Sequence, residues 1–498
     1  MLDGFRFRCY PTHAQAQTLL RWIGCQRVIY NAKVQEDRYF RTFARKTLAL
    51  AGQYAPQDQR YSQFITDDTA WLKEVPSQVL RNGAVRWKQA YGRFYKKLAG
   101  RPTLHRKTGA QSVWLTDELF TFTPVVDAET GEVTYRLRVG TPKFPVGELT
   151  YVAHRAHTVP NSIRLIVEAG RWFLTFSTDD ETVLPSKQDT ADWLAEFGEE
   201  ELRERAVGCD RGVAVPLMTQ AGRPFALLPV QDARLAQKQK AIKRWQRKLA
   251  RRTKGGANRR KAAKRLAALS QYGKNVREDF AHQTSHALVA DPKTLLLVFE
   301  ALGVKRMTAR PKAKQDPETG RWLPNGARAK AGLNKGILAS AWGQIKRCTD
   351  YKAQRAGKLM IEVPAHHTSQ TCSHCGHVHP DNRLSQAEFV CLRCGFAENA
   401  DINAARNIQH RGVAIIRAGW LRMKLTALKS RNRSEAKAGE KQSKKTMRRA
   451  QRQSPATGLG AECSEVTLEE THISREGGSA ALTHASWNRE TPPYSLAG

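Results

Sequence analysis

Four closely spaced cysteines constrain the fold of this chain more than any other feature. Two Cys-x2-Cys pairs, Cys372/Cys375 and Cys391/Cys394, are separated by fifteen residues. This spacing lets two tight turns supply four thiolates to one tetrahedral zinc ion. Because four thiolates fill the coordination shell, we expect one structural zinc in a small module over residues 370–398.

The residues around these cysteines support that interpretation. Gly376 and Gly395 directly follow the second cysteine of each pair and allow the sharp turn that aims backbone amides at sulfur. The histidines His374, His377 and His379 could replace a ligand, although we expect them at the surface. The other five of the nine cysteines are scattered, which favours a metal site in a reducing compartment over a disulfide framework.

Length and charge narrow the class of protein. The chain has 498 residues and a net charge of +36, from 82 Lys and Arg against 46 Asp and Glu. It is long enough for several domains, and so large a surplus favours a polyanionic partner. Nucleic acid is the leading candidate and an anionic membrane surface is the alternative. No apolar run approaches the ~18 residues of a membrane span, and the N-terminus lacks the apolar core of a signal peptide.

The first 185 residues predict a helical unit and a strand-rich unit. An alternating segment at 5–10 indicates a strand, and Thr12 with Gln15 forms the pattern of a capping box at a helix start. A second helix has an apolar stripe at Leu80, Ala84, Trp87, Tyr91, Phe94 and Leu98. From 111 to about 180 the period becomes that of strands, which predicts a small β-barrel or curled sheet that the N-terminal strand could join.

The second half of the chain alternates apolar strands with helices. Residues 188–204 are polar and acidic and indicate a linker or surface helix. Strands are expected at 206–216, 294–300 and 359–363, an amphipathic helix at 336–355 and a further helix from 401. Residues 307–331 are rich in Pro, Gly and Lys and indicate a mobile loop. The segment from 429 onward has few large apolar residues, and we expect it to be largely disordered.

Three carboxylates occupy favourable places in this pattern. Asp210 interrupts an apolar strand, Glu300 ends another, and Asp401 opens the helix after the cysteines. If the fold brings them together they repel one another, so they need cations to stay ionised. Magnesium suits oxygen ligands and phosphate substrates, and two such ions can promote phosphodiester hydrolysis. A helix-capping role for Asp401 is the alternative. Four other acids lie at helix ends or in the polar loop, and we do not expect them in this site: Asp279, Asp291, Asp316 and Glu318.

A long basic run lies between the first two of these strands. Residues 238–265 are predicted to be helical and contain fourteen basic side chains and no acid, so pairing along the helix cannot explain them. Phosphate contact is the better interpretation, and the run has no apolar face suited to a membrane. The residues we expect to bind nucleic acid are Lys243, Arg244, Arg247, Lys248, Arg251, Arg252, Arg259, Arg260, Lys261, Lys264 and Arg265.

Several ordered motifs resemble a known family, the transposon-encoded RNA-guided nucleases called TnpB and their descendants, the compact type V (Cas12-like) CRISPR effectors. The resemblance covers roughly residues 1–425. It rests on Gly208-Cys209-Asp210-Arg211-Gly212, Val298-Phe299-Glu300-Ala301-Leu302, the segment from Thr368 to Gly376, the helix start Asp401-Ile402-Asn403-Ala404-Ala405-Arg406-Asn407-Ile408, and shorter matches at 8–12 and 27–31. One departure is Arg211, which stands where an aliphatic residue is more usual.

The resemblance implies a multi-domain α+β protein with an RNase H-like RuvC nuclease domain and an inserted zinc ribbon. It assigns a wedge-like β-barrel to 1–12 and 111–185, a helical recognition lobe to 13–110 and a linker to 186–204. The nuclease domain would comprise 205–369 and 399–425, the ribbon 370–398, and a basic and polar tail 426–498. It also implies that Asp210, Glu300 and Asp401 are catalytic and bind magnesium, and that Cys372, Cys375, Cys391 and Cys394 bind zinc.

The activity implied is cleavage of target double-stranded DNA directed by a guide RNA. Such a protein reads duplex shape and a short flanking motif, while base pairing reads sequence. The chain length favours a compact CRISPR effector over a transposon-encoded TnpB. Guided binding that represses without cutting is a further alternative, and a transposase or recombinase lacks support. We expect a prokaryotic cytoplasmic protein, nucleoid-associated when bound to DNA, acting as a monomer or homodimer on one guide RNA.

Overall fold

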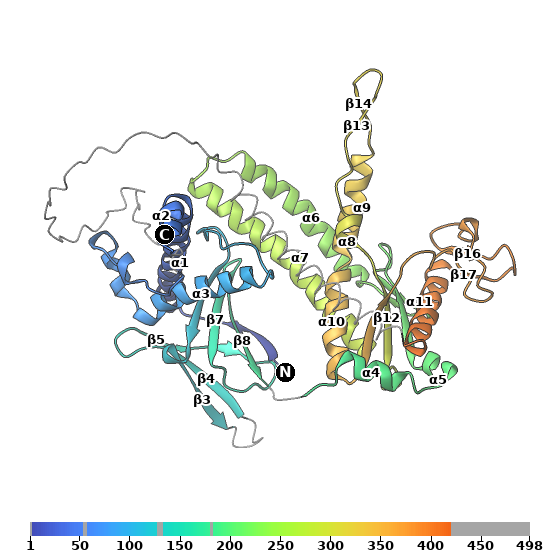
Figure 1. The fold of residues 1–498 in the computed structure, drawn as a ribbon, viewed down its shortest axis with the longest axis horizontal. Helices are drawn as coiled ribbons and strands as arrows, with labels where there is room; N and C mark the ends of the chain where they lie inside the picture. Colours follow the sequence, from blue (N-terminus) through green and yellow to red (C-terminus); the bar gives the residue numbers. More distant parts are fainter. Residues whose placement is uncertain (1, 53–56, 127–132, 180–182, 420–498) are drawn as a thin grey trace, which may run out of the picture. The chain divides into compact units, whose positions relative to one another are not determined.

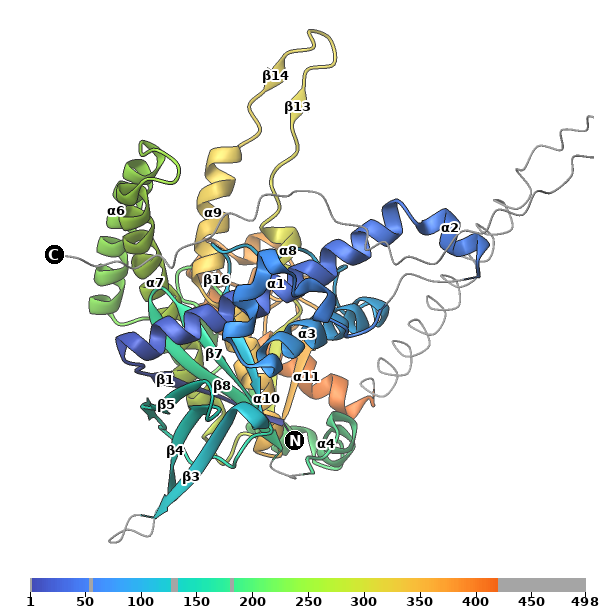
Figure 2. The ribbon, with the colours of Figure 1, turned by 90° about the vertical axis from the view of Figure 1, so that its left-hand side faces the viewer.

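The computed structural model describes residues 2–52, 57–126, 133–179 and 183–419. Figures 1 and 2 show an N-terminal part of long helices and antiparallel strands, followed by a part built on a mixed sheet. Within these described residues, no helix is long and apolar enough to cross a membrane. The tail predicted over 426–498 lies outside them.

The first helix begins where the sequence predicts. Thr12 caps α1 (His13–Thr42): its hydroxyl accepts from the Gln15 amide, and the Gln15 side chain accepts from the Thr12 amide. This reciprocal pair satisfies two amides that the helix start leaves free. The helical part continues with α2 (Arg45–Leu50), η1 (Ser62–Phe64), η2 (Asp67–Glu74) and α3 (Ser77–Tyr95).

The apolar stripe predicted for the second long helix is largely confirmed. Leu80, Ala84, Trp87 and Tyr91 are buried on α3, where they pack α3 against α1 and the neighbouring core. Leu98 is an exception, because α3 ends at Tyr95 and the Leu98 side chain is 68% exposed.

The strand-rich segment forms two open sheets, and the described residues contain no closed barrel. The five-stranded sheet has the order β2-β7-β8-β1-β6, and the three-stranded sheet has the order β3-β4-β5. The N-terminal strand joins the larger sheet as predicted, pairing antiparallel with β8 from Leu2 opposite Asp179 to Cys9 opposite Trp172. The strands are β1 (Leu2–Cys9), β2 (Gln111–Thr116), β3 (Phe120–Val126), β4 (Val133–Gly140), β5 (Pro145–Leu149), β6 (Tyr151–Val152), β7 (Ser162–Glu168) and β8 (Arg171–Asp179).

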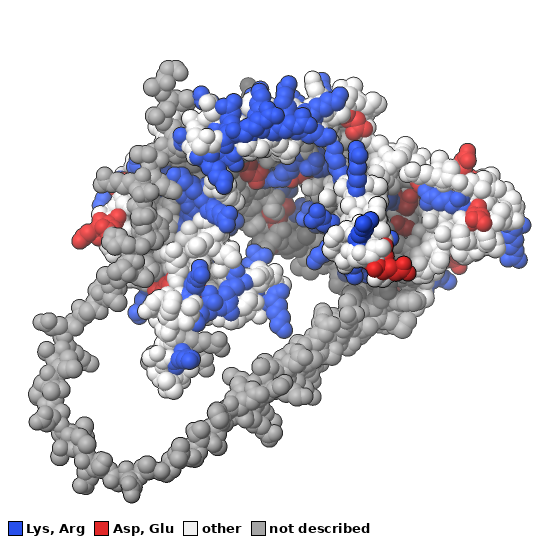
Figure 3. Space-filling view, turned by 90° about the horizontal axis from the view of Figure 1, so that it is seen from above, with Lys and Arg blue, Asp and Glu red and all other residues white. Residues whose placement is uncertain are grey.

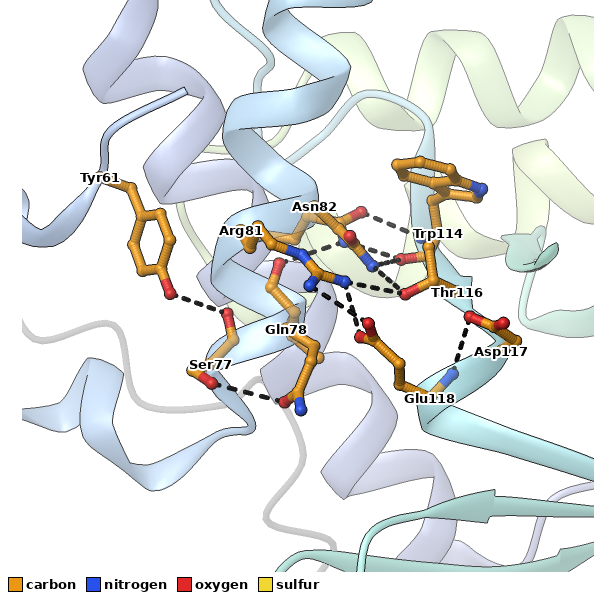
Figure 4. Close-up of polar contacts among 11 residues, drawn as sticks. Tyr61, Ser77, Gln78, Arg81, Asn82, Trp114, Thr116, Asp117 and Glu118 are labelled. Carbon is orange, nitrogen blue, oxygen red and sulfur yellow. Dashed lines mark hydrogen bonds and ion pairs between the residues drawn. The ribbon is translucent and has the colours of Figure 1, made fainter. Parts of the chain in front are cut away.

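Helix side chains explain why the larger sheet stays open at β2. The Gln26 side chain on α1 donates to the Trp114 carbonyl at 2.9 Å and accepts from the Trp114 amide at 2.9 Å, as a neighbouring strand would. Asn82 on α3 also donates to the Trp114 carbonyl, and Arg81 pairs with Glu118 just beyond the strand (Figure 4). These side chains take the place of a closing strand, so the predicted barrel is wrong.

A second five-stranded sheet carries two of the three singled-out carboxylates. Its order is β11-β10-β9-β12-β15, with β9 and β15 parallel to the central β12 and β10 antiparallel to β9. The strands are β9 (Ala206–Asp210), β10 (Leu217–Thr219), β11 (Pro224–Phe225), β12 (Leu296–Glu300) and β15 (Leu359–Val363). The predicted linker contains two short helices, α4 (Lys187–Leu194) and α5 (Glu199–Glu204).

Four predicted segments are divided differently in the structure. The strand predicted over 206–216 ends at Asp210, and the chain turns back so that β10 pairs antiparallel with β9. The basic run is not one helix: it spans α6 (Pro229–Ala250) and α7 (Ala257–Val289), because the chain turns at Gly255, where φ is +86°. The expected loop at 307–331 instead contains the last residue of α8 (Val304–Met307), the hairpin β13 (Lys314–Gln315) and β14 (Trp322–Leu323), and the start of α9 (Ala327–Ala339). A left-handed Ala341 separates α9 from α10 (Trp342–Arg355).

The last described helix, α11 (Ala400–Arg417), lies unusually close to the second sheet. A Cβ on Gly208 of β9 would come within 2.1 Å of the Ala405 carbonyl oxygen of α11. A Cβ on Gly412 of α11 would come within 2.3 Å of Val298 Cγ2 of β12. Two glycines, one on each element, therefore permit this contact between helix and sheet.

We expect Gly412→Ala to destabilise the protein by about 1–3 kcal/mol, because the added methyl group overpacks the contact with β12. Gly24→Ala is the matched control, since Gly24 lies within α1 and a Cβ added there would meet nothing within 4 Å. It should leave stability unchanged or raise it by up to about 1 kcal/mol. Thermal unfolding measures both, and equal melting temperatures would contradict the close-packing argument.

Candidate active site and metal centre

Three separate elements bring Asp210, Glu300 and Asp401 to one place. Asp210 ends β9 and Glu300 ends the neighbouring parallel strand β12, whose Phe299 pairs with Cys209. Asp401 lies in the first turn of α11, which packs on these strands. The carboxyl ends of adjacent parallel strands therefore meet the start of one helix.

The helix start leaves the Asp401 carboxylate available. The capping residue of α11 is Asn399, whose side-chain oxygen accepts from the amides of Asp401 at 3.0 Å and Ile402 at 3.3 Å. Asn399 thus performs the capping role considered for Asp401. The Asp401 side chain instead faces the cavity shared with the other two acids.

A cavity of about 240 Å³ opens at this point. It is polar and is bordered by strand ends, by the turn that leads into the cysteine module and by the module itself. The lining residues are Asp210, Arg211, Gly212, Ala214, Glu300, Leu302, Ala365, Thr368, Ser369, Arg383, Gln386 and Asp401.

Burial raises the pKa values of all three carboxyl groups, and repulsion from the other two acids adds to this at Asp210. Burial, reinforced by the charges of Glu300 and Asp401, raises the pKa of Asp210 from 3.8 to about 7. Burial also raises the pKa of Glu300, which is 6% exposed, although a hydrogen bond from Thr368 opposes this. The pKa of Asp401 is raised by burial, an effect that nearby Arg383 opposes.

These observations fit the magnesium hypothesis. The donor set consists of carboxylate oxygens, which hard divalent cations prefer. Each acid is pushed toward its neutral form by burial, and Asp210 also by the other two charges. A cation held among them would reverse that effect and stabilise all three ionised groups.

Arg383 is a cavity residue that the sequence analysis did not single out. Its guanidinium donates to the carbonyls of Ser385 at 3.2 Å and Gln386 at 2.8 Å, and lies 3.4 Å from Asp401 Oδ1. Its charge opposes the rise in the pKa values of all three acids. It lies in the spacer between the cysteine pairs, where no periodicity or spacing marks it, so only the folded geometry reveals it.

The four cysteines form a compact cluster. Their sulfur atoms all lie within 4.8 Å of one another, with Cys372 Sγ 3.8 Å from Cys394 Sγ and Cys375 Sγ 3.6 Å from Cys391 Sγ. Four sulfurs at the usual Zn–S length of about 2.3 Å would be about 3.8 Å apart in a tetrahedron. The cluster therefore fits one zinc ion.

The local backbone of this module follows the sequence prediction. Gly376 and Gly395 have φ of +75° and +70°, and each amide donates to the carbonyl of the first cysteine in its pair at 2.9 Å. The described cluster contains no histidine; the His374 ring stacks on Phe396. The module also contains η4 (Pro380–Asn382), β16 (Glu388–Val390) and β17 (Ala397–Asn399).

Two asparagines attach the cysteine module to α11. Asn403 donates to the Thr371 carbonyl at 2.8 Å and accepts from the Ser373 amide at 2.9 Å. Asn407 donates to the Thr368 and Thr371 carbonyls. Because Asp401 lies on the same helix, these contacts couple the module to the carboxylate cavity.

The basic run forms a helical hairpin with a cationic surface. Figure 3 shows Lys and Arg side chains gathered in a band at the top of the view, over α6 and α7. Many of the basic side chains in 238–265 are exposed, among them Lys248, Arg251 and Lys264. The eleven predicted to bind nucleic acid lie on this hairpin and its turn, away from the carboxylate cavity lining.

The acids excluded by the sequence analysis lie elsewhere. Asp291 binds the Lys293 amide and the Thr294 hydroxyl, and Asp316 binds the Glu318 amide and the Thr319 hydroxyl, both in local turns. Asp279 accepts from Gln283 on α7. None of these three borders the cavity, and neither does Glu318.

Three family models match separate parts of the chain. "Helix-turn-helix domain" matches residues 1–38, "Probable transposase" 198–310, and "Cas12f1-like, TNB domain" 342–408. The described part of 1–38 contains β1 and most of α1, so it is not two helices joined by a turn. The last match includes the four cysteines and Asp401, and the second includes Asp210 and Glu300.

Individual relatives match over two different ranges. "Putative RNA-guided DNA endonuclease InsQ" of Escherichia coli is 29% identical over 84% of this chain and 94% of that protein. "Putative RNA-guided DNA endonuclease" of Streptomyces pristinaespiralis is 28% identical over 83% of this chain and 90% of that protein. A Cas12f1 endodeoxyribonuclease of Sulfoacidibacillus thermotolerans is 52% identical, but over 12% of this chain and 14% of that protein. The resemblance to TnpB proteins and compact type V effectors is confirmed.

Solved structures give a weaker likeness. A Cas12f1 complex with guide RNA and target DNA matches 82% of this chain and 99% of that chain at 15% identity, with a TM-score of 0.28. The RNA-guided endonuclease Cas_phi3 matches 83% of this chain and 92% of that chain at 10% identity, with a TM-score of 0.38. Scores this low do not establish a shared arrangement of the whole chain.

We expect one zinc per chain in the purified protein, bound by the four thiolates. Cys391→Ser should abolish stoichiometric zinc binding and lower the melting temperature, because structural zinc contributes folding free energy. Cys348→Ser is the control, since Cys348 lies on α10 outside the cluster. Elemental analysis measures zinc, and a metal-free wild-type protein of unchanged stability would contradict the zinc hypothesis.

In magnesium-free buffer at pH 8, we expect Asp210→Asn to raise the melting temperature by several degrees. Raising the pKa of Asp210 from 3.8 to about 7 means that stability falls as pH rises through this window. The ionised form is thereby destabilised by roughly 4 kcal/mol. The gain should shrink towards pH 5, where folded wild-type protein keeps Asp210 protonated.

Glu204→Gln is the matched control, because Glu204 is exposed at the end of α5. It should show no comparable difference between the two pH values. A wild-type protein as stable as Asp210→Asn at pH 8 would show that neither burial nor the other two acids disfavours the ionised form of Asp210.

Proposed function

We propose that this chain, a relative of TnpB and the compact type V effectors, is a guide-RNA-directed DNA endonuclease with a single RuvC-type active site. The observation that carries the proposal is the meeting of Asp210, Glu300 and Asp401 in one polar cavity beside the four-cysteine cluster. The two relatives that match most of the chain carry the name RNA-guided DNA endonuclease, which supports it.

In this proposal the three carboxylates would hold magnesium for the hydrolysis of a phosphodiester bond by water. Bound magnesium would supply an activated water and stabilise the leaving oxygen. Thr368 keeps the Glu300 carboxylate oriented through its hydroxyl, and Asn399 keeps Asp401 free of the capping role. Arg383 presents a guanidinium at the cavity, where it can bind a phosphate oxygen of the DNA strand.

In this proposal, most of the remaining parts of the chain bind the guide RNA and the target DNA. The exposed α6–α7 hairpin would contact the phosphate backbone of guide RNA and target DNA through its eleven predicted residues, without reading sequence. The strand-rich segments 1–12 and 111–185 would hold guide RNA, and the helices of 13–110 would grip the heteroduplex. Residues 205–369 and 399–425 would form the nuclease domain and 370–398 the zinc ribbon.

The matched ranges favour a transposon-type TnpB nuclease over a CRISPR effector. The InsQ match runs through 84% of this chain, whereas the Cas12f1 matches cover 12–14%. We propose action at DNA in the prokaryotic cytoplasm, by a monomer or homodimer on one guide RNA. Guided binding without cutting is the second candidate, because the resemblance includes proteins that retain the acids yet do not cut.

We expect the protein loaded with its guide RNA to cut a matched plasmid in magnesium, and Asp210→Ala to reduce the rate at least ~10³-fold. Removing one ligand leaves the cation incompletely held, whereas the nucleic-acid contacts on α6 and α7 remain. Target binding should therefore be unchanged. Gel analysis of plasmid cleavage and filter binding measure the two properties separately.

Asp279→Ala is the matched control, since Asp279 lies exposed on α7 and does not border the cavity. It should cut like the wild type. Retained cutting by Asp210→Ala would overturn the assigned site. Tight guided binding without strand scission by the wild type, at any magnesium concentration, would support the second candidate.

A further inference from the structure

One arginine lies buried at the edge of the carboxylate cavity. Arg211 directly follows Asp210, is 6% exposed and occupies a position where the resemblance leads us to expect an aliphatic residue. A buried charge is costly unless its surroundings satisfy it. The contacts of Arg211 therefore indicate what it does at this site.

Arg211 is the first residue after β9, and its guanidinium reaches the face of the sheet that Cys209 and Phe299 share. Cys209, two residues earlier, belongs to the core formed with Phe299 and with Ile345 of α10. The Arg211 guanidinium carbon lies 5.7 Å from the centre of the Phe299 ring, on that same side. Asp210 lies on the side of α11, as Gly208 does. The guanidinium thus lies on the side of Phe299, and Arg211 also borders the carboxylate cavity.

From this position Arg211 reaches the backbone of Glu300. Pairing between β9 and β12 ends at Cys209 and Phe299, so the next carbonyl of β12 has no strand partner from β9. The Arg211 guanidinium donates to that Glu300 carbonyl, which also accepts from the Leu302 amide at 3.0 Å. Arg211 therefore extends the connection between the two strands by one residue, to the residue that carries the carboxylate.

A second contact holds the other end of Glu300. The Thr368 hydroxyl donates to Glu300 Oε1 and also contacts the Ala365 carbonyl at 3.1 Å. Backbone and side chain of Glu300 are thus held from two directions. The Arg211 backbone is fixed in turn, because the Trp342 indole donates to the Gly212 carbonyl at 3.0 Å.

Within the described part of the chain, the Arg211 guanidinium forms no ion pair with a carboxylate. Its Nε is buried without a hydrogen-bond partner among the described residues. The nearby acid Glu362 is paired with Lys346 at 2.7 Å. The carbonyl contact and the stacking on Phe299 are therefore the defined contacts of Arg211.

We propose that Arg211 is a positioning residue that fixes Glu300 for cation binding, by clamping the carbonyl at the end of β12. This inference rests on the proposed function for its catalytic consequence, although the cation site itself can be tested separately. Arginine suits the role because its planar group can stack on Phe299 and donate sideways to the carbonyl, which lysine cannot do together.

The test titrates magnesium into full-length protein and follows the melting temperature. We expect Arg211→Leu to raise the magnesium concentration that gives half the maximal stabilisation at least about tenfold, as for other residues that orient metal ligands. Arg211→Lys should raise this magnesium concentration severalfold. It replaces Arg211→Leu in the test if the leucine variant fails to fold. Arg223→Leu is the control, because it removes an arginine stacked 4.8 Å from Phe225 in the same sheet.

A general loss of packing would lower the melting temperature without moving the magnesium midpoint, so a change under about twofold would overturn the inference. An absent magnesium response in the wild type would overturn it as well. Cleavage by the guide-loaded protein, measured over the same magnesium range, separates the two proposals. One outcome is that the wild type binds its target without cutting while the Arg211 variant still shifts the magnesium midpoint. That result would support the role of Arg211 and refute the proposed nuclease activity.

Discussion

Three carboxylates can share one small cavity only if something other than the carboxylates holds the backbone that carries them. Here the close packing of α11 on β9 and β12 holds that backbone in place. Gly208 and Gly412 remove the two Cβ atoms that would keep helix and sheet apart. Gln409 of α11 adds hydrogen bonds of 2.7 Å to the carbonyls of Arg203 and Ala206. Packing and hydrogen bonding thus offset a repulsion that would otherwise separate the acids.

Positive charge near the acids comes from three arginines. The charge of Arg411 opposes the rise in the pKa of Glu300, and the other two approach the cavity from different positions. Arg383 approaches Asp401 from the cysteine module, at the open side of the cavity. Arg211 approaches from the side of Phe299 and donates to backbone instead of carboxylate. Both positions leave room for a cation among the acids, because neither arginine forms a short ion pair with a carboxyl group there. The cysteine module therefore contributes to the electrostatics of the site as well as to the fold.

The sequence was informative where local chemistry decides the structure. The cysteine spacing, the capping box at Thr12 and the apolar strand ending in Glu300 all correspond to observed elements. The strand expected over 206–216 is shorter than predicted, because β9 ends at Asp210. Their convergence on Asp401 needed the resemblance, since periodicity alone says nothing about which strand ends are neighbours. Arg383 was missed because its position depends on how the spacer between the cysteines folds. The barrel was wrong because Gln26 contacts a strand 88 residues away, an interaction that no local pattern encodes.

The hydrogen bonds that cover the edge strand β2 affect how readily two copies of the chain can associate. An uncovered sheet edge is a template on which another copy can add a strand, and it is a common start of aggregation. Gln26 occupies both hydrogen-bonding groups of Trp114 at one edge, while the opposite edge strand, β6, is two residues long. This sheet thus offers little free edge to a second copy of the chain, which disfavours association between chains through its strands.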